Sequence, residues 1–508
     1  MLFRTRAATS GFLLSGTLVV LLASGIPSSA TAQAKQATVS ARLAGKLTAH
    51  LTNTSFSAVL ADKVKLVYTF SSPSKSFAYQ IMRQNGAEWP TVVYSKRNRS
   101  FHGSHTTTVS NLFKYLSGMQ LITIGHYRLK LSSDTNSVLL TFEVVSPKYL
   151  SNVAAISAGD ADTCAVLSSG SVVCWGLSDD GRLGDGTIGP YGHGLIPVIT
   201  SGIKTATAVS AGGQHTCALL SGGTVECWGY NGAGQLGKGT IAGSLVPVSI
   251  GGITGAAAVS ASSGSLSHSC ARLSGGAVYC WGDNEEGQLG NGTTTGSSTP
   301  IAASGIANAA QVSAGLYDTC AVLANDSTDC WGSNFHGQLG DGTKASSSIP
   351  VAVRGIANAA QVSVNALHAC ALLSTGAVKC WGYNGSGQLG NGTKTDSSTP
   401  VTVSGITNAI AISAGFNHTC ALLSGGTVEC WGDNSDWKLG NGTTKSSSTP
   451  VAVSGITNAT QVSAGASHTC ALLSSGTVEC WGDGWDGELG NGIYSWGKTP
   501  VRVIDVNP

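Results

Sequence analysis

Residues 211–229 read AGGQHTCALLSGGTVECWG, and residues 464–482 repeat this string almost unchanged as AGASHTCALLSSGTVECWG. Five further relatives of the string lie elsewhere in residues 151–508. The first cysteines of the seven units follow one another at steps of 53 or 50 residues. A period near fifty, in short and glycine-punctuated apolar segments, is typical of a β-propeller rather than of a helical solenoid.

Each unit contains four short apolar segments that we expect to be strands, and the middle two are separated by Ser-Gly-Gly or a close variant. Such a three-residue connection predicts a hairpin. In the second unit it places Leu219 opposite Val225 and Cys217 opposite Cys227. Directly opposed residues on antiparallel strands lie close enough for a disulfide, so we expect one in every unit. The predicted pairs are Cys164 with Cys174, Cys217 with Cys227, Cys270 with Cys280, Cys320 with Cys330, Cys370 with Cys380, Cys420 with Cys430 and Cys470 with Cys480.

The N-terminal segment predicts export from the cell. Arg4 and Arg6 precede an apolar stretch at 11–26 and small residues at 32–34, so residues 1–34 are interpreted as a cleaved signal peptide. A membrane anchor is the alternative, although the stretch is short and interrupted by polar residues. All 14 cysteines follow residue 160. Their even number and constant spacing favour disulfides over zinc, and hence a secreted or cell-surface protein.

The repeated units resemble those of the regulator of chromosome condensation family. The resemblance rests on HTCALLSGGTVECWGYNGAGQLGKGT at 215–240 and on seven Trp-Gly and seven Leu-Gly pairs. It departs in the sixth unit, where Trp437 replaces the usual glycine. Because members of that family fold as seven-bladed β-propellers, the resemblance implies an all-β chain with such a propeller at 151–508. Either every blade is continuous in sequence, or the last strand, at 501–504, completes the first blade.

Residues 35–150 contain no cysteine and no repeat. Apolar and polar residues alternate near 64–70 and 127–131, and a turn at 132–137 precedes an apolar segment at 138–145. This pattern predicts strands. GHYRL at 125–129 resembles the tyrosine corner of immunoglobulin-like sandwiches, so we expect a small immunoglobulin-like β-sandwich domain at 35–150.

The two expected domains carry opposite charge. Residues 35–150 contain 14 Lys and Arg against 4 Asp and Glu, whereas residues 151–508 contain 12 against 22. One interpretation is two solvated surfaces, or domains that dock by opposite charge. The other is that the basic domain binds an anionic cell-envelope polymer through residues 94–105, YSKRNRSFHGSH. A nucleic acid partner is not expected for an exported chain.

One position of the repeat carries an ionisable residue in every unit. We find no nucleophile elbow, zinc-protease helix, phosphate loop or dinucleotide fingerprint. The position two residues before the first cysteine holds His or Asp in every unit. Such a ring of residues could bind metal or act in acid–base catalysis. Recurrence in every unit favours a structural role instead, in which each side chain bonds local backbone. These residues are Asp162, His215, His268, Asp318, His368, His418 and His468. We therefore expect no catalytic residue, no metal and no cofactor.

Asn-Gly-Thr recurs at Asn291, Asn391 and Asn441, with Asp341 in the same place in another unit. The triplet fits a glycosylation sequon. It also fits a turn, which is the simpler interpretation because aspartate occupies the equivalent position.

Two short windows vary while the rest of the repeat stays constant. One window precedes the His/Asp position and the other follows Trp-Gly. If the strands run as assigned, both windows are loops at one end of the propeller. Large aromatic side chains on loops rich in glycine and serine bury area against a partner at low conformational cost. The candidate partner-binding residues are Tyr230, Leu316, Tyr317, Phe335, His336, Tyr383, Phe416, Trp437 and Trp485.

The sequence thus favours a secreted, non-enzymatic propeller that binds a protein through one face. The resemblance implies that this mode is feasible, since a bacterial β-lactamase inhibitor of the same family binds its target in this way. Guanine-nucleotide exchange, the activity of the family's nuclear namesake, is the second hypothesis. The third is an extracellular enzyme that acts on a polymer in the central channel.

Overall fold

The computed structural model describes residues 148–188, 193–265 and 267–505, together with the backbone of seven strands between residues 39 and 145. It divides into two compact units, Met1–Lys148 with Asn507–Pro508, and Tyr149–Val506. The described residues form strands, turns and loops without helices, so no helix among them is long and apolar enough to span a membrane. The proposed signal peptide lies outside the described residues.

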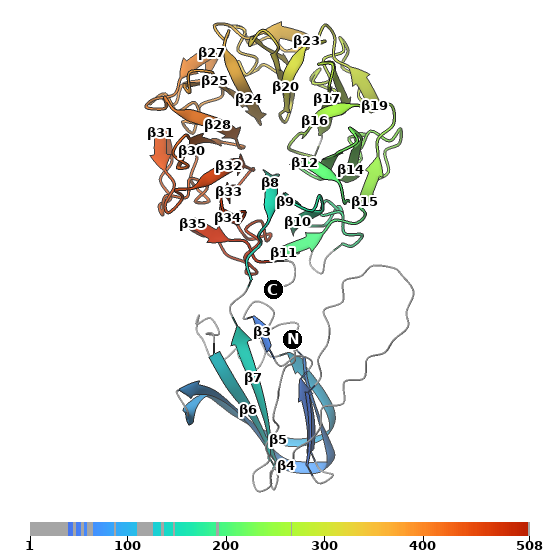
Figure 1. The fold of residues 1–508 in the computed structure, drawn as a ribbon, viewed down its shortest axis with the longest axis vertical. Helices are drawn as coiled ribbons and strands as arrows, with labels where there is room; N and C mark the ends of the chain where they lie inside the picture. Colours follow the sequence, from blue (N-terminus) through green and yellow to red (C-terminus); the bar gives the residue numbers. More distant parts are fainter. Residues whose placement is uncertain are drawn as a thin grey trace. The chain divides into compact units, whose positions relative to one another are not determined.

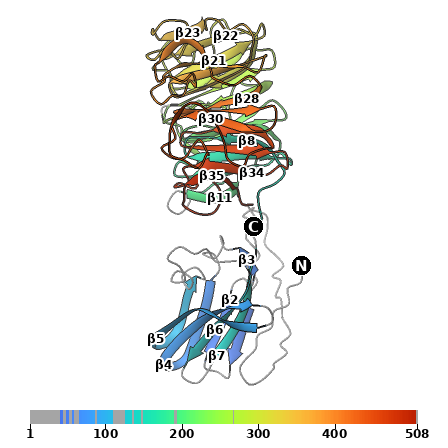
Figure 2. The same ribbon diagram turned by 90° about the vertical axis from the view of Figure 1, so that its left-hand side faces the viewer.

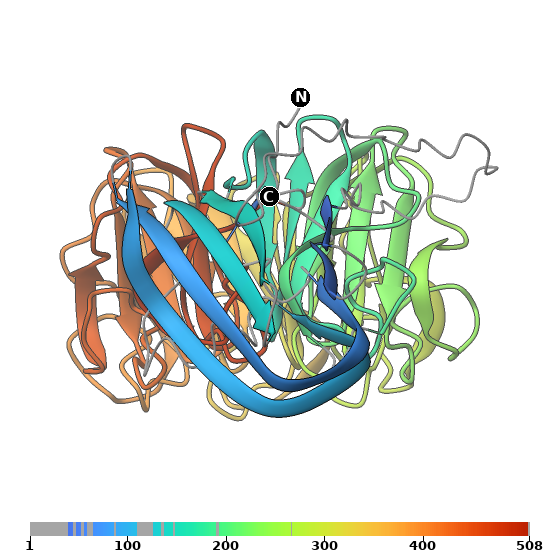
Figure 3. The same ribbon diagram turned by 90° about the horizontal axis from the view of Figure 1, so that it is seen from below.

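The N-terminal unit contains one seven-stranded sheet with the order β1-β2-β4-β6-β7-β3, in which β5 pairs with β4. β4 and β5 form a long, curved antiparallel hairpin, drawn in blue in Figure 3. Strands are present where the alternating patterns predicted them, and residues 94–105 lie within β5. The immunoglobulin-like assignment stays a prediction. The strands are β1 (Val39–Leu43), β2 (Leu47–Leu51), β3 (Ser55–Ser57), β4 (Lys65–Asn85), β5 (Glu88–Thr108), β6 (Gly125–Ser133) and β7 (Ser137–Val145).

The second unit is a seven-bladed β-propeller, as the repeat predicted (Figure 1). Each blade is an antiparallel sheet of four strands that follow one another in sequence, so no strand is exchanged between blades. We number the blades 1 (β8–β11) to 7 (β32–β35). Figure 2 shows them from the side, with the strands crossing the thickness of the ring.

The innermost, first strands are β8 (Val153–Ala158), β12 (Ala206–Ala211), β16 (Ala256–Ala261), β20 (Ala309–Ala314), β24 (Ala359–Asn365), β28 (Ala409–Ala414) and β32 (Ala459–Ala464). The second strands are β9 (Asp162–Leu167), β13 (His215–Leu220), β17 (His268–Leu273), β21 (Asp318–Leu323), β25 (His368–Leu373), β29 (His418–Leu423) and β33 (His468–Leu473). The third strands are β10 (Val172–Leu177), β14 (Val225–Gly229), β18 (Val278–Gly282), β22 (Thr328–Gly332), β26 (Val378–Gly382), β30 (Val428–Gly432) and β34 (Val478–Gly482). The outer, fourth strands are β11 (His193–Ile199), β15 (Ser244–Ser249), β19 (Ser297–Ala302), β23 (Ser347–Ala352), β27 (Ser397–Thr402), β31 (Ser447–Ala452) and β35 (Gly497–Arg502).

The register of the central hairpin is the one that the three-residue loop predicted. In blade 2, Leu219 pairs with Val225 and Cys217 pairs with Cys227. All seven predicted disulfides are present, one in each blade, and their cysteines are fully buried. The bonds join Cys164 to Cys174, Cys217 to Cys227, Cys270 to Cys280, Cys320 to Cys330, Cys370 to Cys380, Cys420 to Cys430 and Cys470 to Cys480. The prediction of one covalent link per blade is confirmed.

Each interface between blades is built around the tryptophan of the Trp-Gly pair. Trp228 of blade 2, for example, packs against Leu183 of blade 1 and against the disulfide between Cys164 and Cys174. The equivalent tryptophan is fully buried in all seven blades. Burying so large a side chain at every interface contributes a repeated apolar term to the stability of the ring.

A ring of serine side chains joins the innermost strands. Ser157 Oγ accepts a hydrogen bond from the Ala211 N–H of the next blade at 3.0 Å. Equivalent bonds occur at all seven junctions, including the last one, where the Ala158 N–H donates to Ser463 Oγ at 2.9 Å. The ring therefore closes by the same contacts that join its other blades, and Leu150 adds a backbone bond to Val503.

The Asn-Gly-Thr segments form tight turns, as expected. Asn291 Oδ1 accepts hydrogen bonds from the backbone N–H and the hydroxyl of Thr293, at 3.1 and 2.9 Å. Gly292 has a φ of 83°, which glycine adopts at little cost.

Candidate partner-binding face

The two variable windows lie at the same end of the propeller. Third strands run antiparallel to second strands, and His215, which starts β13, pairs with Gly229, which ends β14. The loops that precede each second strand and follow each third strand therefore meet. We call this end the variable face; in blade 2 it comprises residues 212–214 and 230–243. The hairpin loops of the second and third strands form the opposite end.

The repeated His/Asp position lies beneath the variable face. We expected each side chain to bond local backbone, but the histidines bond the next blade instead. His418 Nε2 lies 2.8 Å from Thr469 Oγ1, and that hydroxyl donates to the Lys438 carbonyl at 3.1 Å. Since the hydroxyl proton is used, the histidine must donate from Nε2. The other histidines at this position repeat the bond to a Ser or Thr of the next blade.

Burial keeps these histidines neutral. It lowers the pKa of His215, His268 and His468 to about 3 and that of His368 to about 4. Protonation would place an N–H at Nδ1, and this atom has no partner in His268, His368, His418 and His468. Among the residues described, no three metal-binding groups converge. The position thus acts as an interblade link.

The junction between blades 4 and 5 lacks this link. Ala369 stands where the other blades have Ser or Thr, and neither carboxyl oxygen of Asp318 has a partner. Asp318 is fully buried, and burial raises the pKa of its carboxyl well above the usual value.

A longer loop of blade 3 crosses the mouth of the central channel at the variable face. Ser263 Oγ donates to Asn365 Oδ1 of blade 5 at 2.6 Å, and the Gly264 N–H donates to Asp160 Oδ2 of blade 1 at 2.8 Å. Leu316 packs against Gly264 and is buried, so this predicted partner-binding residue lies under the loop.

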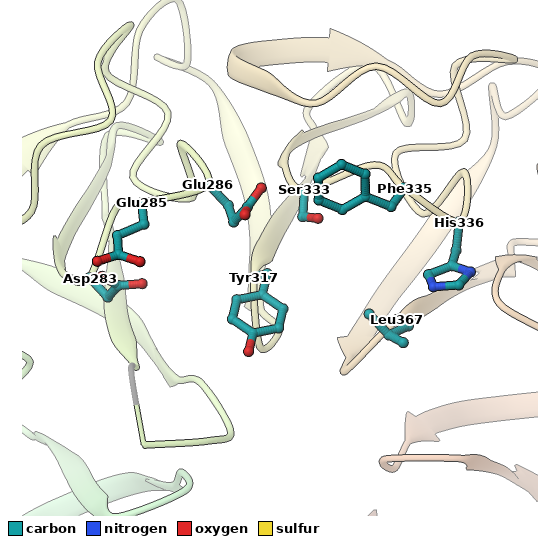
Figure 4. Close-up of a pocket in the computed structure, with 8 residues that line it drawn as sticks. All are labelled: Asp283, Glu285, Glu286, Tyr317, Ser333, Phe335, His336 and Leu367. Atoms are coloured by element: carbon teal, nitrogen blue, oxygen red, sulfur yellow. The ribbon is translucent and has the colours of Figure 1, made fainter.

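A hollow of about 330 Å³ opens on the variable face between blades 3, 4 and 5. Asp283, Glu285 and Glu286 line its blade 3 side. Figure 4 shows Tyr317 between these acids and the side chains of Phe335 and His336. Burial, and then the charge of Glu285, raise the pKa of Asp283. The hollow therefore combines carboxylates on one side with aromatic rings on the other.

Tyr317, Phe335 and His336, all predicted from sequence, meet in this hollow. His336 also contacts the Tyr383 ring edge-on, with centroids 4.9 Å apart, and its Nδ1 lies 3.0 Å from Asp396 Oδ2. Tyr230 is exposed in blade 2, away from this group.

A second group of aromatic residues lies in blades 6 and 7. The rings of Trp437 and Trp496 are 5.2 Å apart, and those of Trp485 and Trp496 are 6.1 Å apart. Lys498 Nζ lies 5.6 Å from the centre of the Trp437 ring. Trp485 and Trp496 are 61% and 50% exposed, which is unusual for tryptophan in a folded domain. We call these three tryptophans the tryptophan cluster.

Sequence reasoning placed Trp437 and Trp485 on the face but missed Trp496. That residue precedes the last outer strand, in a loop reading NGIYSWG, and blades 2 to 6 have Gly, Ser or Asp at the equivalent position. Comparing this third stretch across the repeat would have revealed it. Phe416 of blade 6 is half-buried before β29.

Comparisons with known proteins agree with the fold. One model of the regulator of chromosome condensation (RCC1) repeat matches residues 169–219, 275–322, 330–372, 375–422 and 426–472. A second model of that repeat matches residues 153–182, 206–235, 258–288, 359–388, 409–436 and 459–488. The human E3 ubiquitin-protein ligase HERC2 is 35% identical over 148 residues, which are 29% of this chain but only 3% of HERC2.

Two solved structures share the fold at low identity. Human WBSCR16 has a TM-score of 0.59 and 22% identity, covering 66% of this chain and 94% of that one. Yeast RCC1 (Prp20), solved with Kap60, has a TM-score of 0.58 and 20% identity, covering 70% and 85%.

Proposed function

Since this chain belongs to the regulator of chromosome condensation repeat family, we propose that it is a secreted, non-enzymatic propeller that binds a protein partner through its variable face. The observation that carries the proposal is the tryptophan cluster. Exposed tryptophans lower solubility in a monomer, whereas aromatic residues in a protein interface supply much of the binding energy.

The backbone of Trp437 supports a functional origin of the cluster. Trp437 has a φ of 59°, in the left-handed region. Glycine occupies this position in every other blade, with φ between 75° and 90°. A bulky side chain in that region costs roughly 1–2 kcal/mol, and such strain is concentrated at functional sites. Trp437 therefore lowers stability locally while it builds the exposed cluster.

A protein is the partner class that these features favour. Solved structures of the similar yeast protein concern its binding to Gsp1p and histones and its complex with Kap60, all of them proteins. For this chain the partner is a proposal, supported by the mixture of aromatic and charged side chains on the variable face. Guanine-nucleotide exchange stays the second hypothesis from family analogy.

Secretion is supported by the seven buried disulfides, because structural disulfides persist in oxidising compartments. Binding of the basic N-terminal region to an anionic envelope polymer, through residues 94–105, stays a separate proposal.

Mutation of the tryptophan cluster tests the proposed function. The full mature chain captures partners from the surface and culture fractions of its source cells, and mass spectrometry identifies them. Dissociation constants are then measured with the purified partner. We expect the double variant Trp485→Ala with Trp496→Ala to bind at least about tenfold more weakly, since truncating each anchor costs more than ~1 kcal/mol.

The matched control is Ile349→Ala, which removes an exposed apolar side chain from the outer strand β23. It should leave the affinity unchanged. Equal affinity of the tryptophan double variant and the wild-type chain would rule out the cluster as the contact.

A further inference from the structure

The hollow between blades 3, 4 and 5 carries acidic charge that no described ion pair of the propeller neutralises. In blade 1, Arg182 Nη2 lies 3.0 Å from both Asp179 and Asp180. In blade 6, Lys438 Nζ lies 2.9 Å from Asp433 and 3.4 Å from Asp436. Arg182 and Lys438 occupy the same place in the repeat, directly before Leu-Gly, and both are buried.

Blade 3 has an uncharged residue, Gln288, at that place. Its amide donates to Asp283 Oδ2 at 2.6 Å. Glu285 and Glu286 form no ion pair with any residue that the structure describes. The acidic loop of blade 3 thus lacks the internal cation found in blades 1 and 6, which leaves room for a cation from another molecule.

Blade 4 also contains a buried hydrogen-bond donor that has no partner among the described residues. Gln338 is fully buried; its Oε1 accepts from the His336 N–H at 2.9 Å, but its Nε2 has no partner within the described part of the chain. In other blades this amide bonds one of two positions. Gln288 uses the residue after Trp-Gly, and Gln235 and Gln388 use the residue before the histidine of the next blade.

In blade 4 those two positions are Ser333 and Leu367, and both line the hollow. Leucine cannot accept the hydrogen bond, and Gln338 Nε2 forms none with Ser333 either, so the amide stays unpaired where the usual partner positions form the wall of the hollow. An unpaired buried donor is unfavourable, and a hydrogen bond to a ligand oxygen would remove that cost.

From this geometry we propose that the hollow binds an arginine side chain of the protein partner. The guanidinium group lies against Glu285 and Glu286, and its flat face stacks on the rings of Tyr317 and Phe335. A backbone carbonyl of the partner accepts from Gln338 Nε2 once the Leu367 side chain shifts away from that buried atom. This inference rests on the proposed function, because it specifies the chemistry of the partner that the variable face recognises.

Saturation-transfer NMR with the full mature chain tests the inference without the partner. The probe is the peptide Ac-Gly-Gly-Arg-Gly-Gly-NH2 at low ionic strength. Its controls replace arginine by citrulline, which keeps the shape but lacks the charge, or by lysine. We expect the dissociation constant to rise about tenfold for citrulline, which corresponds to ~1.4 kcal/mol, and several-fold for lysine.

The double variant Glu285→Gln with Glu286→Gln should weaken binding of the arginine peptide to the same extent. The matched control is Asp486→Asn, which removes an acid from the position in blade 7 equivalent to Glu286 and should preserve binding. The proposal would be overturned if the arginine peptide did not bind, or if the citrulline or lysine peptide bound equally well. It would also be overturned if the glutamine double variant bound the arginine peptide as tightly as the wild-type chain. These results are independent of the tryptophan variants, so the hollow can fail while the proposed function holds.

Discussion

Replacing Trp437 by glycine and by alanine separates the backbone cost of this residue from the contribution of its ring. Both variants lose the same contacts, namely the Trp496 ring at 5.2 Å and Lys498 Nζ at 5.6 Å. These losses cancel when the two variants are compared with each other. The difference between them therefore reports the left-handed backbone, whose φ is 59°.

The size of this difference follows from two opposing terms. An L-residue in the left-handed region costs roughly 1–2 kcal/mol, whereas glycine loses about 0.5–1 kcal/mol more chain entropy on folding. We therefore expect the glycine variant to be more stable than the alanine variant by about 1 kcal/mol.

The assay is unfolding in guanidinium chloride, followed by far-ultraviolet circular dichroism, in parallel with the affinity for the partner. The glycine variant should show the higher unfolding midpoint, and both variants should bind the partner equally weakly. An alanine variant as stable as the glycine variant would refute the strain argument. Full affinity in both variants would refute the role of the indole ring.

Three further predictions concern the interior of the propeller. Ala369→Thr should raise the free energy of unfolding by about 1 kcal/mol, because the new hydroxyl gives Asp318 and the Gln338 carbonyl the partner found at other junctions; an unchanged denaturation midpoint would contradict this. Replacing both Cys320 and Cys330 by alanine should lower the free energy of unfolding by about 3 kcal/mol, because the unfolded chain gains loop entropy. Mass mapping without reductant should show all seven links in the wild-type chain, and free thiols throughout would contradict the disulfide assignment. Stability should be greatest near pH 6.5. Stability falls below this pH because the unfolded chain protonates histidines whose pKa in the fold is about 3 or 4. Stability also falls as the pH rises toward 8, because burial raises the pKa values of Asp162 and Glu488 to about 8 in the fold, whereas the same groups are already ionised in the unfolded chain. Denaturation midpoints measured from pH 4 to 9 check this, and a maximum at pH 8 or above would contradict it.

The hairpin register was predictable because it depends on residues close in sequence. A three-residue loop after Leu220 fixes which residue opposes Cys217, and a loop of the same length recurs in all seven units. The number of blades followed from the repeat and from the family resemblance. Ring closure was not predictable, since both alternatives need the same strands, and only the pairing of β35 with β34 decides between them.

The contacts between blades could not be read from one unit. His418 bonds Thr469, which is 51 residues away, and the repeat gives no distance between neighbouring units. The burial of Leu316 depends on the longer loop of blade 3, whose only trace in the sequence is a step of 53 residues from Cys217 to Cys270. The hollow likewise could not be predicted from one unit, because its lining residues, Glu285 and Leu367 among them, come from three blades.

Hydrogen-exchange mass spectrometry of the purified complex tests most directly whether the variable face is where the partner binds. We expect the partner to slow amide exchange in the loops around Trp437, Trp485 and Trp496. The hairpin loops between the second and third strands, at the opposite end, should exchange at the same rate with and without the partner. Protection confined to those hairpin loops, with unchanged exchange around the three tryptophans, would contradict the account.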